Sequence, residues 1–463
     1  MGLSGSIYKS LGHNSRTFLL NAYAFTLNAE RYGDKFKRIF SDFIANEDLS
    51  LEELREYQRE RLKILIRHAY DHVPYYRNTM KSLKLRPSDF NDPGDIAKLP
   101  VLTREDIKLN YNSLKADNVP WYKIRHGHTS GTTGSPLEFL WDTSVCVAHH
   151  AADWRQKKWA GLEFGDRFIS LQGRQIVPLG QARPPFWVMN AVHNQLFMSS
   201  FHLKDDFLKY YVDKIIDFKP KAIEGYPSSL YILARHMENN DIKIPVPVVL
   251  SSSETLLPFQ RELIERVFCC QLFDFYGMAE RVVYGSECRE HKGKHLNMDY
   301  GFTEIVDSHN MPAGQGQYGA VVSTGLWNFA MPLIRYKTSD ISAISESRCE
   351  CGRSFQLFDN ITTKAEDIIV LKDGRLIPPS IMTHPFKTIK NVSMSQIVQE
   401  DHDHVKVYLK KNEAFTNSEY KELYNGMRER LGSDVNIEII FAPDLDKNAS
   451  GKFRWVISKI PIP

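Results

Sequence analysis

The spacing of apolar residues over residues 51–70 predicts an amphipathic helix. Leucine, isoleucine and tyrosine recur there three and four positions apart, which places them on one helix face. Ser50 can cap this helix, and Glu53, three residues on, completes a capping box. We expect residues 1–85 to be largely helical, with Val73-Pro74 closing the long helix. A turn at 92–96 should precede a second capped helix near 103–106.

From about residue 130 to 340, short apolar runs alternate with amphipathic segments such as residues 205–218. Such alternation indicates an α/β fold with mainly parallel sheet, whose strands are buried on both faces. Four runs are read as buried strands: 168–171, 222–225, 246–250 and 271–275.

The pattern changes after Cys351-Gly352-Arg353. Residues 368–371 and 404–409 read as alternating strands, 418–431 as a helix and 435–440 as another strand. This order predicts a small α+β domain at the end of the chain. We expect an N-terminal domain over 1–365, with a helical region over 1–110, and a C-terminal domain over 366–463.

Composition narrows the class of protein. The chain has 463 residues, of which 42% are hydrophobic and 25% charged, and its net charge is +3. This near balance argues against a dedicated nucleic-acid surface. The sequence contains no run of 18 apolar residues, so we predict no membrane span. With no signal-peptide pattern and only six cysteines, we expect a cytoplasmic protein.

The stretch Thr129-Ser-Gly-Thr-Thr-Gly-Ser-Pro136 is the most conspicuous loop. Glycines allow backbone amides to approach an anion, and the hydroxyls add donors, so the loop is suited to wrap a polyphosphate. It lacks the lysine of a Walker loop. The alternative is a polar hairpin turn before the strand-like run 137–141. The residues that would hold phosphate are Ser130, Gly131, Thr132, Thr133 and Gly134.

Four further stretches follow in order: 251–254 (Ser-Ser-Ser-Glu), 274–280 (Asp-Phe-Tyr-Gly-Met-Ala-Glu), 336–340 (Tyr-Lys-Thr-Ser-Asp) and 447–452 (Lys-Asn-Ala-Ser-Gly-Lys). With the loop at 129–136, this series resembles the adenylate-forming superfamily, and most closely the phenylacetate-CoA ligase family. Residues 65–77 and 225–229 are also similar to that family, so the resemblance covers nearly the whole chain. Residues 373–379 resemble a subgroup associated with polysaccharide biosynthesis.

The resemblance implies that a carboxylate attacks the α-phosphate of ATP to give an acyl-adenylate and pyrophosphate. Ser130, Thr132 and Thr133 would then hold the β and γ phosphates, and Glu280 would help to bind Mg²⁺. Lys452 would be the mobile catalytic cation brought by the C-terminal domain.

The nucleotide itself would be held by residues of the middle motifs. Tyr276 would lie against the adenine with Ser253 and Glu254 nearby, and Asp340 would accept hydrogen bonds from the ribose hydroxyls. The remaining nucleotide-site residues are Asp274, Gly277 and Lys364. Taken singly, Tyr276 and Asp340 also fit a packing residue and a turn residue.

A cysteine and histidine set resembles the structural zinc site of some relatives. Cys349 and Cys351 would bind Zn²⁺ together with Cys288 and His295, although His291 is an alternative ligand. The other interpretation is a set of reduced thiols packed in a turn. Cys146, Cys269 and Cys270 are predicted to be core residues.

Departures from the family pattern concern the second half-reaction. Ser135 stands where relatives usually have lysine, Ser339 replaces a glycine, and Thr363-Lys364 replaces the usual Gly-Arg at the hinge. Adenylation of a small acid, aryl or arylacetic, is the expected first step. The acceptor is CoA, or alternatively an amine, a sugar or a carrier protein. A nucleotide-binding relative without catalysis is the third alternative, and the resemblance also implies a homodimer.

Overall fold

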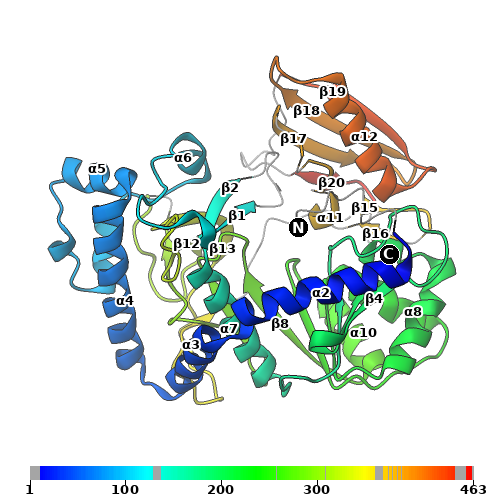
Figure 1. The fold of residues 1–463 in the computed structure, drawn as a ribbon, viewed down its shortest axis with the longest axis horizontal. Coiled ribbons are helices and arrows are strands. Elements are labelled where there is room, and N and C mark those ends of the chain that lie inside the picture. The colour runs from blue at the N-terminus through cyan, green and yellow to red at the C-terminus, as the bar shows by residue number, and fades with distance from the viewer. Residues whose placement is uncertain are drawn as a thin grey trace.

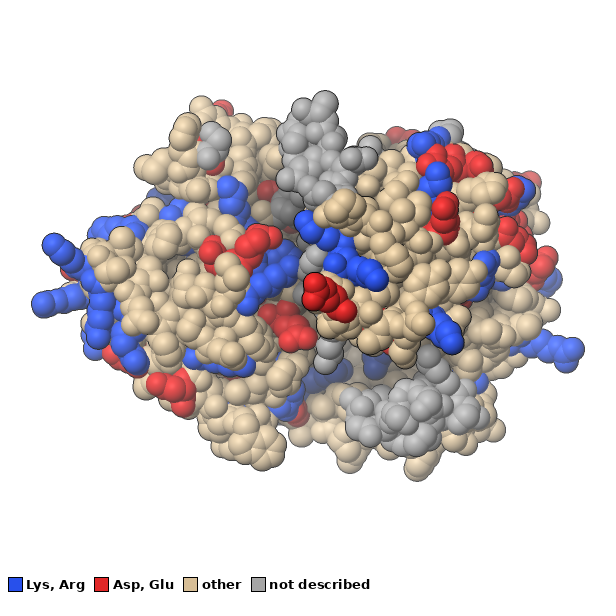
Figure 2. All heavy atoms as spheres, turned by 90° about the horizontal axis from the view of Figure 1, so that it is seen from above, with Lys and Arg blue, Asp and Glu red and all other residues tan. Residues whose placement is uncertain are grey.

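The computed structural model describes residues 11–128, 137–256, 258–307, 309–359, 369–373, 375–377, 379–382, 384–386, 388–389, 391–443 and 455–460. Within these ranges, no helix combines the length and the apolarity needed to cross a membrane. Figure 1 shows a large N-terminal part with a smaller, orange to red, C-terminal part above it. Basic and acidic side chains are interspersed on the face seen in Figure 2, as a net charge of +3 suggests.

The N-terminal region is helical, as predicted. Its helices are α2 (His13–Tyr32), α3 (Asp34–Ala45), η1 (Asn46–Asp48), α4 (Leu51–His72) and α5 (Pro74–Ser82). Ser50 caps α4 in the expected capping box, because its side chain accepts from the Glu53 N–H while the Glu53 carboxylate accepts from Ser50. The short helices η2 (Pro87–Asp89), η3 (Pro93–Lys98) and α6 (Arg104–Leu109) follow, and Thr103 caps α6.

After η4 (Trp121–Lys123), a hairpin leads into the helix that joins the N-terminal region to the main sheet. Strand β1 (Ile124–His128) pairs antiparallel with β2 (Glu138–Asp142), which confirms a strand after the glycine-rich loop. Asp142 then caps α7 (Thr143–Trp159) through the N–H groups of Ser144 and Val145. The residues between the two strands, 129–136, lie outside the described part of the chain.

A nine-stranded sheet forms the centre, in the order β14-β10-β9-β8-β7-β6-β3-β5-β4. The five strands from β8 to β5 are parallel, as the α/β pattern predicts, whereas both edges are antiparallel. Strands such as β9 and β10 follow one another through short connections, which permit only antiparallel pairing. The bounds are β3 (Phe168–Leu171), β4 (Trp187–Asn190), β5 (Gln195–Met198), β6 (Ala222–Gly225), β7 (Val248–Ser252), β8 (Gln271–Gly277), β9 (Tyr284–Glu287), β10 (Lys294–Leu296) and β14 (Leu357–Phe358).

Helices cover one face of this sheet: α8 (Asp205–Phe218), α9 (Pro227–Asn239) and α10 (Pro258–Phe268). Alternate strand residues such as Ile223 and Val249 join their core, while Ala222 and Val248 face the other side. Two short helices, η5 (Ala191–His193) and η6 (Ser200–His202), flank β5. A separate antiparallel sheet contains β11 (Gly301–Val306), β12 (Gly319–Gly325) and β13 (Tyr336–Ser342).

A buried ion pair ties the N-terminal helices to the sheet region. Arg155 on α7 and Asp299 after β10 are fully buried, and their nearest N and O atoms lie 2.7 Å apart. Arg155 also donates to the carbonyl of Phe43 at 2.9 Å, and Asn46 donates to Asp299 at 3.0 Å. These bonds satisfy both charges, which would otherwise be costly in a dry core.

The C-terminal domain has its own core. Its four-stranded sheet, in the order β19-β18-β17-β20, packs against α12, and a two-stranded sheet joins β15 to β16. The bounds are β15 (Ile369–Val370), β16 (Leu376–Ile377), α11 (Pro379–Met382), η7 (His384–Phe386), β17 (Val392–Gln399), β18 (His404–Lys411), α12 (Asn417–Leu431), β19 (Asn436–Phe441) and β20 (Val456–Ser458). The helix and strands predicted from the sequence lie within two residues of these positions.

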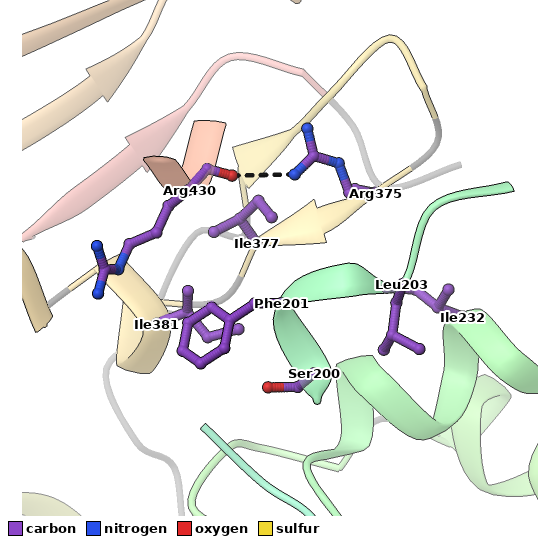
Figure 3. A pocket seen from close by; sticks show the side chains of 8 residues that line it. All are labelled: Ser200, Phe201, Leu203, Ile232, Arg375, Ile377, Ile381 and Arg430. Carbon is purple, nitrogen blue, oxygen red and sulfur yellow. Dashed lines mark hydrogen bonds between the residues drawn. The ribbon is translucent and has the colours of Figure 1, made fainter. Parts of the chain in front are cut away.

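The two domains meet at a small pocket shown in Figure 3. Ser200, Phe201, Leu203 and Ile232 line it from the N-terminal domain, and Arg375, Ile377, Ile381 and Arg430 line it from the C-terminal domain. Arg375 donates to the carbonyl of Arg430 at 3.0 Å, and the Arg430 guanidinium lies 5.7 Å from the centre of the Phe201 ring. Phe201 also packs against the C-terminal core, so the junction is apolar with basic side chains at its border.

Candidate active site

Three of the motifs lie at one edge of the central sheet. Residues 225–229, 251–254 and 274–280 fall at the carboxyl ends of β6, β7 and β8 or directly after them, and these three strands are parallel neighbours. Ligand sites of open α/β sheets form outside this edge. The strand register therefore brings together residues that are far apart along the chain.

Tyr276 and Asp340 join two of the motifs. The Tyr276 hydroxyl donates to Oδ2 of Asp340 at 2.5 Å, which links β8 of the main sheet to β13 of the three-stranded sheet. Burial, followed by the nearby Asp340 carboxylate, raises the pKa of Tyr276 well above its ordinary value, so the hydroxyl remains a donor. The sequence indicated both residues but not the bond between them.

Glu280 is held in a similar way. Its Oε1 accepts from the Tyr336 hydroxyl at 2.8 Å, and its side chain is buried. Burial raises the pKa of Glu280, and the Tyr336 hydrogen bond opposes that rise. A buried carboxylate is costly unless a cation or donors compensate, so this group suits a site where a metal ion binds.

The Asp274 carboxylate contacts side chains on neighbouring strands of the main sheet. Its Oδ1 accepts from Ser251 at 2.6 Å, and its Oδ2 lies 2.9 Å from Nζ of Lys294. Its backbone N–H donates to Glu287 at 3.0 Å. Asp274 thus fastens β7, β8 and β10 together, and it positions the Tyr276 segment through the strand on which both residues lie.

Ser253, Glu254 and Gly277 surround the same edge. Ser253 has a φ of +70°, in the left-handed region, where the chain leaves β7. The Glu254 carboxylate accepts at 3.1 Å from the N–H of Ser228 in the first turn of α9, a position favourable to negative charge. A Cβ at Gly277 would meet its nearest neighbour, Tyr284, at 3.8 Å, an ordinary contact, so packing alone does not require glycine there.

Several predicted residues lie outside the described part of the chain. These are the loop residues Ser130, Gly131, Thr132, Thr133 and Gly134, the hinge residue Lys364 and the catalytic lysine Lys452. The strands β1 and β2, in register from His128 opposite Glu138, mark where the loop is attached.

A second cluster collects three thiols and an imidazole. Cys288, His295, Cys349 and Cys351 each offer an atom within 4.8 Å of the others. The Sγ atoms of Cys288 and Cys349 lie 3.5 Å apart, and the Sγ of Cys351 lies 3.4 Å from Nε2 of His295. Tetrahedral zinc, with bonds of about 2.3 Å to sulfur, needs similar spacings. Burial lowers the pKa of His295 to about 4, so the imidazole is in its neutral, ligating form.

The alternative histidine lies elsewhere. His291 Nδ1 contacts Glu287 at 3.1 Å and is not in the cysteine cluster. Cys146, Cys269 and Cys270 were predicted to be core residues. This prediction is wrong for Cys269, which is exposed, whereas Cys146 and Cys270 are partly buried. Cys269 has a φ of +48° directly after α10, so the turn between α10 and β8 carries its side chain outward.

The sequence pattern did not indicate a cluster of buried charged side chains that lies beside the main sheet. Lys157 on α7 contacts Asp153 at 2.7 Å and Glu224 at 3.2 Å. Burial raises the pKa of Glu224, and the charge of Lys157 opposes it. The available signal was a glutamate inside the apolar run 222–225; its lysine partner could not be inferred from spacing. The same holds for Lys294 beside Asp274.

Comparison with known proteins supports the resemblance seen in the motifs. The profile of the CapK C-terminal domain family matches residues 369–459. Protein CapK of Staphylococcus aureus is 27% identical over 421 residues, covering 88% of this chain and 90% of that protein. A phenylacetate-coenzyme A ligase of Escherichia coli is 26% identical over 414 residues, covering 84% and 91%. A phenylacetate-coenzyme A ligase of Thermus thermophilus is 25% identical over 357 residues, covering 72% and 76%.

The fold agrees with these relatives. The crystal structure of 2-hydroxyisobutyryl-CoA ligase in complex with 2-HIB-AMP and CoA superposes with a TM-score of 0.58 at 19% identity, covering 89% of this chain and 91% of that one. The expected α/β fold with a small C-terminal domain is thereby confirmed. The chain is a relative of the phenylacetate-CoA ligases, with the fold of the adenylate-forming CoA ligases and a C-terminal domain of the CapK type.

Proposed function

We propose that this protein activates a small carboxylic acid with ATP, forming an acyl-adenylate, and transfers the acyl group to CoA. One observation carries the proposal: side-chain hydrogen bonds join the 274–280 and 336–340 motifs, Tyr276 to Asp340 and Tyr336 to Glu280. The homologues named phenylacetate-coenzyme A ligase supply the reaction class. An aryl or arylacetic acid is the substrate class that they suggest.

The nucleotide would lie over the carboxyl ends of β7 and β8. Asp340, which the Tyr276 hydroxyl holds in place, would accept from a ribose hydroxyl. Gly277, where packing leaves room for a Cβ, would let the nucleotide approach the strand closely. Tyr276, Ser253 and Glu254 would border the adenine.

The phosphates would bind where a metal ion and positively charged side chains can stabilise the negative charge that builds up on the α-phosphoryl group during the reaction. A carboxylate oxygen of the acid attacks the α-phosphorus, and the bond to pyrophosphate breaks. Glu280 would help to hold Mg²⁺ there, while Ser130, Gly131, Thr132, Thr133 and Gly134 cradle the leaving group. Lys452 would approach the α-phosphate, and Lys364 would supply charge at the hinge.

The acyl acceptor is the open part of the proposal. Thr363-Lys364 stands in place of the usual Gly-Arg at the hinge, and the CapK-type domain covers 369–459. These features favour a second candidate, in which an amine, sugar or carrier protein takes the acyl group instead of CoA. Both candidates share the adenylation step.

We also propose that Cys288, His295, Cys349 and Cys351 hold a structural Zn²⁺. Four donors within 4.8 Å of one another suit a closed tetrahedral site. The group joins β9, β10 and the turn before β14, so a metal there would fasten the antiparallel edge of the main sheet.

The deciding experiment is acid-dependent exchange of labelled pyrophosphate into ATP with Mg²⁺, over a panel of aryl, arylacetic and small aliphatic acids. Exchange with at least one acid, lost in Lys452→Ala, supports adenylation. Thioester formation on adding CoA selects the first candidate, and adenylate that accumulates with CoA untouched selects the second. ATP binding without exchange for any acid would overturn both and leave a nucleotide-binding relative.

A further inference from the structure

The side of α7 that faces the main sheet is polar. Its residues recur three and four positions apart and so share one helix face, which consists of Cys146, His149, Asp153, Gln156 and Lys157. The hydroxyl of Tyr284 on β9 lies 3.4 Å from Oδ1 of Asp153 and 3.3 Å from Oε1 of Gln156. Nζ of Lys157 lies 3.2 Å from the Glu224 carboxylate on β6. This polar face of α7 is therefore directed at the sheet rather than at bulk solvent.

The polar face of α7 borders the candidate active site. Tyr284 is the strand partner of Gly277 in the 274–280 motif. Glu224 directly precedes Gly225, which is the strand partner of Ser251 in the 251–254 motif. An acid bound beside a nucleotide at this edge of the sheet would therefore reach the polar face of α7.

Arg281 adds a buried hydrogen-bond donor to this region. It directly follows Glu280, and its guanidinium lies 3.9 Å from the centre of the Trp141 ring. Burial, and then the charge of nearby Arg281, lowers the pKa of His149 well below its ordinary value. Arg281 thus stands close to the polar face of α7, and the imidazole beside it is neutral.

Two buried donors in this region have no hydrogen-bond partner within the described residues. They are Nη1 of Arg281 and Nε2 of Gln156, whose side chain is 1% exposed. Both carboxylate oxygens of Glu224 are already engaged, by Gln172 at 2.8 Å and by Lys157 at 3.2 Å. An unpaired buried donor is costly, so a ligand that completes this region has to bring acceptor oxygens.

We propose that the activated acid is a hydroxy acid, whose hydroxyl is bound by Arg281 and the polar face of α7. This inference rests on the proposed function and narrows its substrate class. A hydroxyl both accepts and donates, so it suits either orientation of the Gln156 amide and can also donate to the neutral His149 imidazole. An unsubstituted acid would leave the donors unpaired, and a site built to hydrogen-bond a hydroxyl rejects the analogue that lacks it.

Pyrophosphate exchange with matched acids tests the proposal. The panel compares phenylacetate with para-hydroxyphenylacetate, benzoate with meta-hydroxybenzoate, and butyrate with beta-hydroxybutyrate and gamma-aminobutyrate. In at least one set, kcat/KM should favour the hydroxylated acid by about a hundredfold or more. Equal values in every set would overturn the hydroxy-acid assignment and leave adenylation in place, and so would a preference for the amino compound. Exchange with none of the acids would overturn the proposed function, and this inference with it.

Arg281→Met tests the residue itself. The change removes the donor, so the preference for the hydroxylated acid should shrink about tenfold or more, with the KM for ATP unchanged. The ratio of the two kcat/KM values is the readout, because a mere disturbance of the neighbouring Glu280 lowers both values alike. Arg235→Met on α9 is the matched control, since that guanidinium also lies over a ring, 5.9 Å from the centre of Tyr231, and it should leave the ratio as it is. An unchanged ratio in both Arg281→Met and His149→Leu would overturn the assignment of this surface.

Discussion

At the scale of single residues, the candidate site consists of carboxylates whose positions are set by tyrosines. Asp340 and Glu280 each accept a hydroxyl, from Tyr276 and Tyr336 respectively. A neutral donor fixes a carboxylate without neutralising its charge, so the charge stays available for a metal or for ribose hydroxyls. Two substitutions separate these roles.

Asp340→Asn should raise the KM for ATP about tenfold or more, because an amide has only one acceptor oxygen and the loss of one good hydrogen bond is about 1.4 kcal/mol. The pyrophosphate exchange assay gives the measurement. Asp359→Asn is the control, since Asp359 accepts from Tyr318 at 2.9 Å in a similar but exposed pair. An equal effect of both substitutions would refute the role of Asp340.

Glu280→Gln should abolish exchange and yet stabilise the fold at neutral pH. The folded pKa of Glu280 is raised by burial above the ordinary 4.5. Ionising Glu280 therefore costs more free energy in the folded chain than in the unfolded chain. The resulting loss of stability grows as the pH rises above the pKa of the unfolded chain. Melting temperatures between pH 5 and about pH 8 should fall less with pH in Glu280→Gln than in the wild type without Mg²⁺. The exposed change Glu413→Gln should leave the slope as it is.

At the scale of elements, the antiparallel edge of the main sheet combines β9 and β10, which a short connection joins, with β14, which returns to this edge after the separate sheet of β11, β12 and β13. The cysteine cluster lies where these strands meet, beside an apolar group that includes Trp159 and Phe355. A metal bound there would contribute its binding free energy to folding, because unfolded ligands are far apart.

Purified protein should contain one zinc per chain by elemental analysis. Cys351→Ser should lower that content and the melting temperature together, since serine is a poor zinc ligand of similar size. The exposed Cys269→Ser is the matched control and should change neither. Full-length protein that carries no metal, yet melts at the same temperature with and without a chelator, would contradict the zinc assignment.

At the scale of the whole molecule, two cores meet at the pocket of Figure 3. Phe201 belongs to the N-terminal domain but packs against the C-terminal core, and Val370 of the C-terminal domain packs into the core of α8, α9 and α10. Each domain thus contributes an apolar residue to the other. We therefore expect the two cores to unfold together.

Phe201→Ala should separate the unfolding of the two domains. Removing the ring deletes apolar contact and the contact with the Arg430 guanidinium, a loss of about 1–3 kcal/mol for a half-buried phenylalanine. Scanning calorimetry should then resolve two transitions. Phe415→Ala, which removes a half-buried ring within the C-terminal domain, should lower the stability of that domain without weakening the junction. A single unshifted transition for Phe201→Ala would show that the junction does not couple the cores.

The sequence alone predicted the elements whose signal is local. The capping box at Ser50, the buried runs 168–171 and 222–225 and the helix 205–218 all appear at the expected positions. Apolar spacing and caps act within a few residues, so the chain itself carries that information. The ordered motifs likewise indicated the family before any geometry was available.

Only the tertiary structure decided which side chains meet. The Tyr276 to Asp340 bond spans 64 residues, and the choice of His295 over His291 depends on the strand pairing of β9 with β10. Spacing also failed at Cys269, which a left-handed turn carries into solvent. Contacts of this kind depend on sheet order and register, because packing across the whole core, rather than any local preference, sets them.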